Sequence, residues 1–161
     1  MGRNQALGLL GWLLLCFLVS AVGAIASISA SSFYRELTQP QWAPPAWLFG
    51  PVWSTLYTLM AISAWLVWRQ GGWRVHGHAL GLFLVQLGFN AIWSWVFFAW
   101  KLGFWALVDI TILWGLIVAT LIRFWAVSRG AGALLIPYMV WVGFAWGLNF
   151  ALWRLNPEVL G

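Results

Sequence analysis

The chain has 161 residues, 63% of them hydrophobic and only 7% charged, with a mean hydropathy of +0.88. Too few polar side chains are available to cover a folded surface, which excludes a soluble globular protein. The net charge of +5 comes from basic residues scattered singly between apolar segments, so the chain has no basic stripe for nucleic acid.

Five apolar segments have the length of about 20 residues that a membrane-spanning helix needs. In chain order they cover residues 6–28, 47–68, 79–100, 104–126 and 133–154. A proline-rich loop over residues 29–46 separates the first two, and the other connections are short. The sequence therefore predicts an all-α fold in which residues 1–161 form a single integral membrane domain, a bundle of five transmembrane helices.

The first segment has two features of a cleaved signal peptide, because Arg3 precedes it and Ala24-Ile25-Ala26 resembles a cleavage site. Its apolar run is longer than the roughly 7–15 residues of a signal core, which favours a retained helix. Cys16 is the only cysteine and lies inside this segment, so an internal disulfide is excluded.

The basic residues indicate an orientation in the membrane. We call the side of the N-terminus side A and the opposite side B; side A then carries Arg3, Arg69, Arg74, Arg123 and Arg129, and side B carries Arg35, Lys101 and Arg154. Basic residues in short loops favour the cytoplasmic side, so this excess weakly predicts a cytoplasmic N-terminus.

The least generic part of the sequence runs from residue 34 to residue 57. Pro40, Pro44 and Pro45 fix the backbone φ angle and remove N–H donors, which predicts a stiff, non-helical loop until the second segment begins. With Trp42 and Trp47, such a loop has the features of a lid over a cavity. The alternative is a plain connector whose prolines mark the start of the next helix.

Tryptophan supplies 16 residues, and aromatic belts at the two membrane interfaces account for those near the ends of the segments. They do not account for the tryptophans well inside the segments, which are Trp53, Trp93, Trp114, Trp141 and Trp146. Some of these would fill helix contacts or face lipid, but several together indicate an aromatic cavity.

Polar and small residues divide the third segment into two faces. Gln86, Asn90, Trp93 and Phe97 share one stripe at helical spacing, and a small-residue face with Gly77, Gly81 and Gly88 lies opposite. The fifth segment repeats the division, with Trp141, Ala145 and Leu148 against Gly143 and Gly147. Small-residue faces permit close helix approach, either within the bundle or in a homodimer through the Gly77 and Gly81 face.

Several of these residues are expected at similar depths in the membrane. At 1.5 Å per residue, Asn90 lies near mid-membrane, and Trp53, Ser94, Asp109 and Asn149 lie roughly 7–10 Å from side B. The proline-rich loop is on the same side. We therefore expect a cavity lined by Asn and Trp and covered by that loop.

Catalytic and metal chemistry find little support. Asp109 is expected to form a structural ion pair with Lys101 or Arg154 rather than to carry protons. His76 and His78 fall in the turn before the third segment, and a spacing of two does not align metal ligands on a helix. Because the other acids are only Glu36 and Glu158, we predict no metal site and no catalytic residue.

The chain resembles the tryptophan-rich sensory protein family, also called the translocator protein or peripheral-type benzodiazepine receptor family. The resemblance rests on Phe33-Tyr34, Gln39-Pro-Gln-Trp-Ala-Pro-Pro45, Gly50-Pro-Val-Trp-Ser-Thr-Leu-Tyr57, Phe89-Asn90, Phe97-Phe98, Trp105-Ala-Leu-Val-Asp109, Pro137-Tyr138, Trp141 and Leu148-Asn149. It implies a five-helix, usually dimeric membrane protein that needs no cofactor. It also implies small hydrophobic ligands: porphyrins such as protoporphyrin IX and, in animal members, cholesterol and benzodiazepine-type compounds.

By the same resemblance, the ligand site would use Trp53 and Asn90 as polar contacts and Gly23, Tyr34, Trp93, Trp105, Trp141 and Ala145 as walls. Two departures bear on function. The family commonly has Trp before the loop Tyr, and some members degrade porphyrin in light with its help; here the residue is Phe33. The sterol-recognition pattern would fall at Leu148 to Arg154, but its aromatic is Phe150.

The leading hypothesis is a tetrapyrrole-binding membrane receptor or transporter-like protein with a sensory or transport role in porphyrin or stress regulation. A light-dependent porphyrin-degrading enzyme is the first alternative, with Phe33 counting against it. A structural bundle that recruits partner proteins is the second.

Overall fold

The computed structural model describes residues 3–28 and 30–161, and its regular elements are all helical. In chain order they are α1 (Arg3–Ala26), α2 (Ala30–Glu36), η1 (Ala46–Leu48), α3 (Phe49–Trp68), α4 (Gly72–Ser94), η2 (Trp95–Ala99), α5 (Gly103–Val127), α6 (Arg129–Leu155) and α7 (Pro157–Leu160). The prediction of an all-α fold is confirmed.

Five helical segments of the described chain are long and apolar enough to cross a membrane, as predicted. They are Asn4–Ala26, Ala46–Trp68, Gly72–Ala99, Gly103–Val127 and Arg129–Leu155. A helix satisfies its own backbone hydrogen bonds, which a segment in hydrocarbon must do. On α1 the large exposed residues Leu7, Leu10, Leu14 and Leu18 recur at helical spacing and form one apolar outer stripe. The chain is an integral, multi-pass membrane protein.

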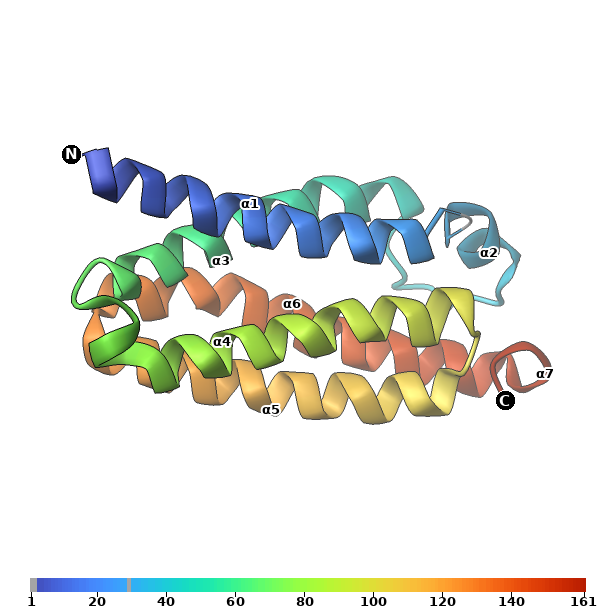
Figure 1. Ribbon diagram of the computed structural model, residues 1–161. Helices are drawn as coiled ribbons and strands as arrows, with labels where there is room; N and C mark the ends of the chain where they lie inside the picture. The colour runs from blue at the N-terminus through green and yellow to red at the C-terminus, as the bar shows by residue number, and fades with distance from the viewer. Residues whose placement is uncertain (1–2, 29) are drawn as a thin grey trace.

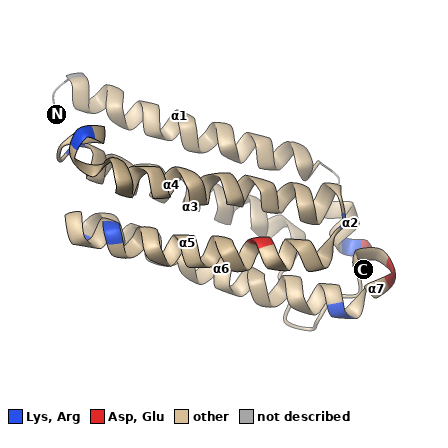
Figure 2. Ribbon diagram, turned by 60° about the horizontal axis from the view of Figure 1, so that its bottom comes forward, with Lys and Arg blue, Asp and Glu red and all other residues tan. Residues whose placement is uncertain are grey.

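The five long helices lie side by side with the N-terminus at one end of the bundle and the C-terminus at the other (Figure 1). Helix α5 packs mainly on α6 and α4, and α1 packs mainly on α3 and α4. Basic residues gather at the two ends of the bundle, and an acidic residue lies part-way along α5 (Figure 2).

The side A half of the bundle is tightly packed. Phe83 of α4 stacks on Phe124 of α5 with ring centroids 5.7 Å apart. The indole N–H of Trp65 on α3 donates to the backbone oxygen of Gln5 on α1 at 3.0 Å, and the hydroxyl of Ser63 donates to the backbone oxygen of Ala131 on α6 at 2.7 Å. These contacts fix α3 to α1 and α6.

The turn between α3 and α4 needs glycine. Gly71 has φ +155° and Gly72 has φ +62°, a region that residues with a Cβ rarely adopt. Helix α4 starts there, earlier than the sequence analysis placed it. His76 and His78 therefore lie inside α4 and not in a preceding turn, although His76 has non-helical angles and kinks the helix.

The loop before α3 is more structured than predicted. Residues 34–36 were expected to be non-helical but belong to α2. The short 3-10 turn η1 leads directly into α3. Helix α2 forms because Phe33, Tyr34 and Leu37 are buried against the end of the bundle, which stabilises a helix too short to form by itself. The non-helical part of the loop is thus limited to residues 37–45.

Candidate functional site

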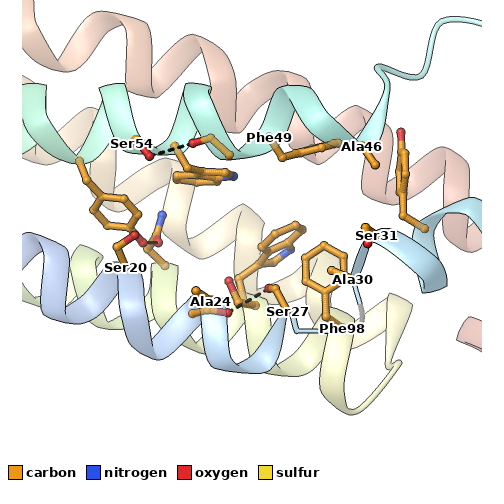
Figure 3. Close-up of a pocket in the computed structure, with 17 residues that line it drawn as sticks. Ser20, Ala24, Ser27, Ala30, Ser31, Ala46, Phe49, Ser54 and Phe98 are labelled. Atoms are coloured by element: carbon orange, nitrogen blue, oxygen red, sulfur yellow. Dashed lines mark hydrogen bonds between the residues drawn. The ribbon is translucent and has the colours of Figure 1, made fainter.

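A cavity of about 390 Å³ lies in the side B half of the bundle, between α1 and α3. Its lining combines aromatic rings, small residues and hydroxyl groups: Ser20, Gly23, Ala24, Ser27, Ala30, Ser31, Tyr34, Ala46, Phe49, Gly50, Trp53, Ser54, Tyr57, Asn90, Trp93, Ser94 and Phe98. Figure 3 shows Ser20, Ala24 and Ser27 of α1 facing Phe49 and Ser54 of α3 across it. The volume falls in the range of roughly 300–1,000 Å³ that is usual for small-molecule sites.

Helix α1 supplies a wall of small residues. Ser20, Gly23, Ala24 and Ser27 recur at i, i+3, i+4 and i+7 and so share one face. The Ser27 hydroxyl donates to the backbone oxygen of Gly23 at 2.9 Å. A Cβ on Gly23 would lie 3.2 Å from the hydroxyl oxygen of Ser94, so glycine permits α1 to approach α4 at the edge of the cavity.

Asn90 connects the cavity to a buried chain of hydrogen bonds. The Tyr57 hydroxyl donates to Asn90 Oδ1 at 2.5 Å, and Asn90 Nδ2 donates to the Tyr138 hydroxyl at 2.9 Å. The Tyr138 hydroxyl in turn donates to Gln86 Oε1 at 2.9 Å. All four side chains are buried, so the chain holds α3, α4 and α6 together at the inner end of the cavity.

The two tryptophans of the cavity differ in what they offer a ligand. The Trp93 indole N–H donates to Asn149 Oδ1 at 3.1 Å, outside the cavity, so Trp93 presents its ring alone. The Trp53 indole N–H has no hydrogen-bond partner among the described residues. Trp53 also packs against Tyr57 and Tyr138, with ring centroids 5.7 Å and 6.3 Å away. Trp53 is therefore a fixed ring with a free donor.

The loop before α3 is fastened at the side B end of the cavity. The Tyr34 hydroxyl donates to the backbone oxygen of Pro44 at 3.0 Å, and burial raises the pKa of Tyr34, which keeps this donor protonated. Asn156, beyond α6, accepts from the Thr38 N–H at 2.8 Å and donates to its carbonyl oxygen at 2.9 Å. The loop is thus tied both to α2 and to the C-terminal end.

Trp42 and Trp47, proposed as parts of a lid, do not line the cavity. Trp42 is 52% exposed and packs on Phe144 of α6, and Trp47 is 70% exposed. The cover over the cavity consists instead of α2 and of the residues that begin α3, with Ala30, Ser31, Tyr34 and Phe49 in its lining.

The cavity collects five of the eight site residues named from the sequence: Gly23, Tyr34, Trp53, Asn90 and Trp93. Ala145 lines a much smaller adjoining pocket. Trp141 lies behind Phe49, with ring centroids 5.9 Å apart. Trp105 lies on the outer face of α5 with 60% of its surface exposed.

Several lining residues were not predicted, and three of them are serines, whose side chains are small. Ser20, Ser27 and Ser54 line the cavity, and Tyr57 supplies its buried hydroxyl. A signal was present in the sequence, because serine, glycine and alanine share one face near the end of α1, where a lipid-facing helix would carry large apolar residues. Phe33, which precedes the lining residue Tyr34, does not line the cavity and packs on Phe97, with ring centroids 6.4 Å apart.

Asp109 does not form the expected ion pair. Among the described residues neither Lys101 nor Arg154 pairs with it, and its Oδ2 is buried with no hydrogen-bond partner. Both cations are exposed at the end of the bundle, whereas Asp109 lies two turns inside α5. Within the described residues no three His, Cys, Asp or Glu side chains come together as metal ligands.

The amino-acid sequence is similar to those of a known family of membrane proteins. The TspO/MBR family matches residues 12–154. Among similar proteins, the protein CrtK of Rhodobacter capsulatus is 38% identical over 146 residues, 88% of each chain. The translocator protein of Homo sapiens is 40% identical over 126 residues, 77% of this chain and 75% of the relative. The tryptophan-rich sensory protein of Cereibacter sphaeroides is 37% identical over 149 residues, 90% of this chain and 92% of the relative.

Proposed function

The chain belongs to the TspO/MBR family, and from this premise we propose that it is a membrane receptor or transporter-like protein that binds tetrapyrroles such as protoporphyrin IX. Its role would be to sense or move porphyrins or similar hydrophobic ligands. Both roles need an intramembrane site that accepts a large, flat, mostly apolar molecule. We expect the protein to supply such a site without a cofactor.

The observation that carries the proposal is the lining of the cavity. Its rings come from Tyr34, Phe49, Trp53, Trp93 and Phe98, and no charged residue is among its described lining residues. Aromatic rings favour stacking on a conjugated ring system, and a few fixed donors orient the ligand. Sterols and benzodiazepine-type compounds are apolar, as porphyrins are. They lack a flat macrocycle that can stack on several aromatic side chains of the cavity at once.

We predict that Trp53→Phe lowers protoporphyrin IX affinity, because it removes the free indole donor of the cavity and keeps an aromatic ring. The loss should be about threefold to tenfold, the range of one hydrogen bond. Titration of the purified protein in nanodiscs, followed by quenching of tryptophan fluorescence, measures it. Trp105→Phe is the matched control, because Trp105 lies on the outer face of α5. Equal effects of the two substitutions would contradict this location of the site.

A light-dependent porphyrin-degrading activity is a second candidate. The observation in its favour is that two oxidisable indoles, Trp53 and Trp93, line the cavity where the ligand would sit. Decay of porphyrin absorbance under fixed illumination, compared with a dark control and with a Trp53→Phe, Trp93→Phe double variant, separates an enzyme from a receptor. A decay that depends on the protein and the two indoles would favour the enzyme.

We also propose that the protein forms a homodimer through α4. A Cβ on Gly77, Gly81 or Gly88 would meet no other atom within 4 Å, so this face of α4 is open to another helix. Small residues allow such close contact in a membrane. For the same reason, a Cβ added there meets no other part of the monomer.

Gly81→Leu is therefore expected to lower the dimer population and leave the melting temperature of the monomer almost unchanged. The detergent-corrected mass from light scattering gives the oligomeric state, and circular dichroism gives the melting curve. Gly115→Leu on α5 is the control, since a Cβ on Gly115 also meets open space. A dimer that persists in Gly81→Leu argues against the α4 face.

We propose an orientation in the membrane from the charges at the two ends of the bundle. Side A carries five basic residues and side B three, so the N-terminus is proposed to be cytoplasmic and the cavity to lie toward the opposite face. Labelling of a cysteine introduced at Gln70, with a reagent that does not cross the membrane, reports the side of the α3–α4 turn.

A further inference from the structure

The cavity has a positively charged neighbour that the proposed function does not use. Arg35 belongs to α2, the short helix that covers the side B end of the cavity. Its Nε donates to the backbone oxygen of Ser31 at 2.9 Å, and Ser31 is itself a lining residue of the cavity. Arg35 itself is not a lining residue, but this bond holds its guanidinium beside Ser31.

The position of Arg35 on α2 sets the direction of its side chain. Ser31 and Arg35 are four residues apart and so lie on the same face of the helix. Arg35 donates only its Nε–H to Ser31. Its terminal nitrogens Nη1 and Nη2 form no hydrogen bond with any described residue. The neighbouring Glu36 forms no ion pair with Arg35 among the described residues. The guanidinium can thus present two parallel donors to an anion.

The other nearby cation is used differently. The amine of Lys101 lies 4.8 Å from the centroid of the Phe33 ring, a cation–π contact. Phe33 is buried against Phe97 and does not line the cavity. On α2 it is two residues from both Ser31 and Arg35, which places it on another face of the helix. Lys101 and Arg35 are both exposed at side B, but of the two only Arg35 is hydrogen-bonded to a lining residue of the cavity, Ser31.

The cavity is open to the surroundings along part of its border. Ala24 of α1, Ser31 of α2 and Gly50 and Ser54 of α3 all line the cavity and are exposed. A small-molecule site of this size encloses roughly 70–90% of its ligand, so one end of the ligand remains outside. A charged group is the part that stays outside, because the uncharged cavity would not repay the loss of its hydration.

We propose that Arg35 binds an anionic oxygen group, a carboxylate, on a ligand whose flat apolar body fills the cavity. This inference rests on the proposed function and adds a selectivity to it: among apolar ligands of one shape, the site prefers acids over their neutral esters. The carboxylate stays at the border, where its two oxygens accept hydrogen bonds from the Nη1 and Nη2 groups of the guanidinium in a bidentate arrangement. An acidic lipid headgroup carries the same chemistry and is the competing source of the anion.

The test compares protoporphyrin IX with its dimethyl ester, which has the same macrocycle and no carboxylate. In nanodiscs of phosphatidylcholine, wild type should bind the diacid about threefold to tenfold more tightly than the ester. Arg35→Gln should weaken binding of the diacid alone and bring the ratio of the two dissociation constants close to one. Arg35→Lys should keep part of the preference. Lys101→Gln, the matched control, should keep the ratio of wild type.

Each outcome has one meaning. An unchanged ratio in Arg35→Gln, or an equal fall in Lys101→Gln, overturns the role of Arg35. Ester and diacid binding equally to wild type overturns the selectivity but leaves the proposed function in place, whereas binding of neither contradicts the proposed function itself. Repeating the titration with phosphatidylglycerol tests the lipid source: a preference that persists supports the ligand carboxylate, and one that disappears assigns Arg35 to the lipid headgroup and overturns the proposal.

Discussion

Asn90→Ala is expected to lower both the stability of the bundle and its affinity for protoporphyrin IX. The substitution removes the acceptor of the Tyr57 hydroxyl and one hydrogen-bonding partner of the Tyr138 hydroxyl. Both hydroxyls are buried, and a buried polar group without a partner costs ~1–3 kcal/mol. Of the two, Tyr138 retains its bond to Gln86, whereas Tyr57 loses its acceptor inside the cavity.

The loss of stability should appear as a melting temperature several degrees below that of wild type in the same detergent. Affinity should fall by about tenfold, because the unpaired Tyr57 hydroxyl and the missing amide change the polar end of the cavity. Tyr138→Phe is the control: Tyr138 belongs to the same network but does not line the cavity. It should lower stability and change affinity by less than about twofold. If Tyr138→Phe weakened binding as much as Asn90→Ala, Asn90 would act only through the fold.

Asn90 also shows what could be predicted from the sequence. Hydrophobic length predicted the five spans, and helical periodicity placed Gln86, Asn90, Trp93 and Phe97 on one stripe. The structure spreads that stripe along α4 and into η2. Asn90 and Trp93 reach the cavity, Gln86 reaches the buried network, and Phe97 joins a second cluster of packed residues.

Other features depend on tertiary contacts that a single sequence does not encode locally. The π-helical turn η2 is marked by the bond from the Trp100 N–H to the Trp95 carbonyl oxygen, at 2.9 Å. A π-helical turn has more residues per turn than an α-helix, so it shifts the register of side chains, and here Phe98 lines the cavity while Phe97 is buried. Likewise, the outward position of Trp105 depends on how α5 is rotated in the bundle. The unpaired Asp109 depends on that rotation as well.

The largest loss of binding is expected from a bulky side chain at Gly23, about tenfold or more, because filling a packed space costs ~1–3 kcal/mol or displaces the ligand. A Cβ there would already lie 3.2 Å from Ser94 Oγ and 3.6 Å from Ser94 Cβ. Gly23→Ala requires Ser94 to move by only a few tenths of an ångström and should be mild. Gly23→Leu adds three further carbons, which must either enter the cavity or separate α1 from α4.

Porphyrin titration and thermal unfolding of the same preparations distinguish these two results. Gly11→Leu is the matched control on the same helix, because Gly11 is exposed and a Cβ there meets no atom within 4 Å. Should Gly23→Leu separate the helices and unfold early, Ala24→Phe supplies the second test, since Ala24 lines the cavity yet is exposed and has room to tolerate a ring. We expect a folded Ala24→Phe protein with weakened binding and a Gly11→Leu protein that binds like wild type. Unchanged affinity in both Gly23→Leu and Ala24→Phe would show that the ligand does not occupy the space between α1 and α3.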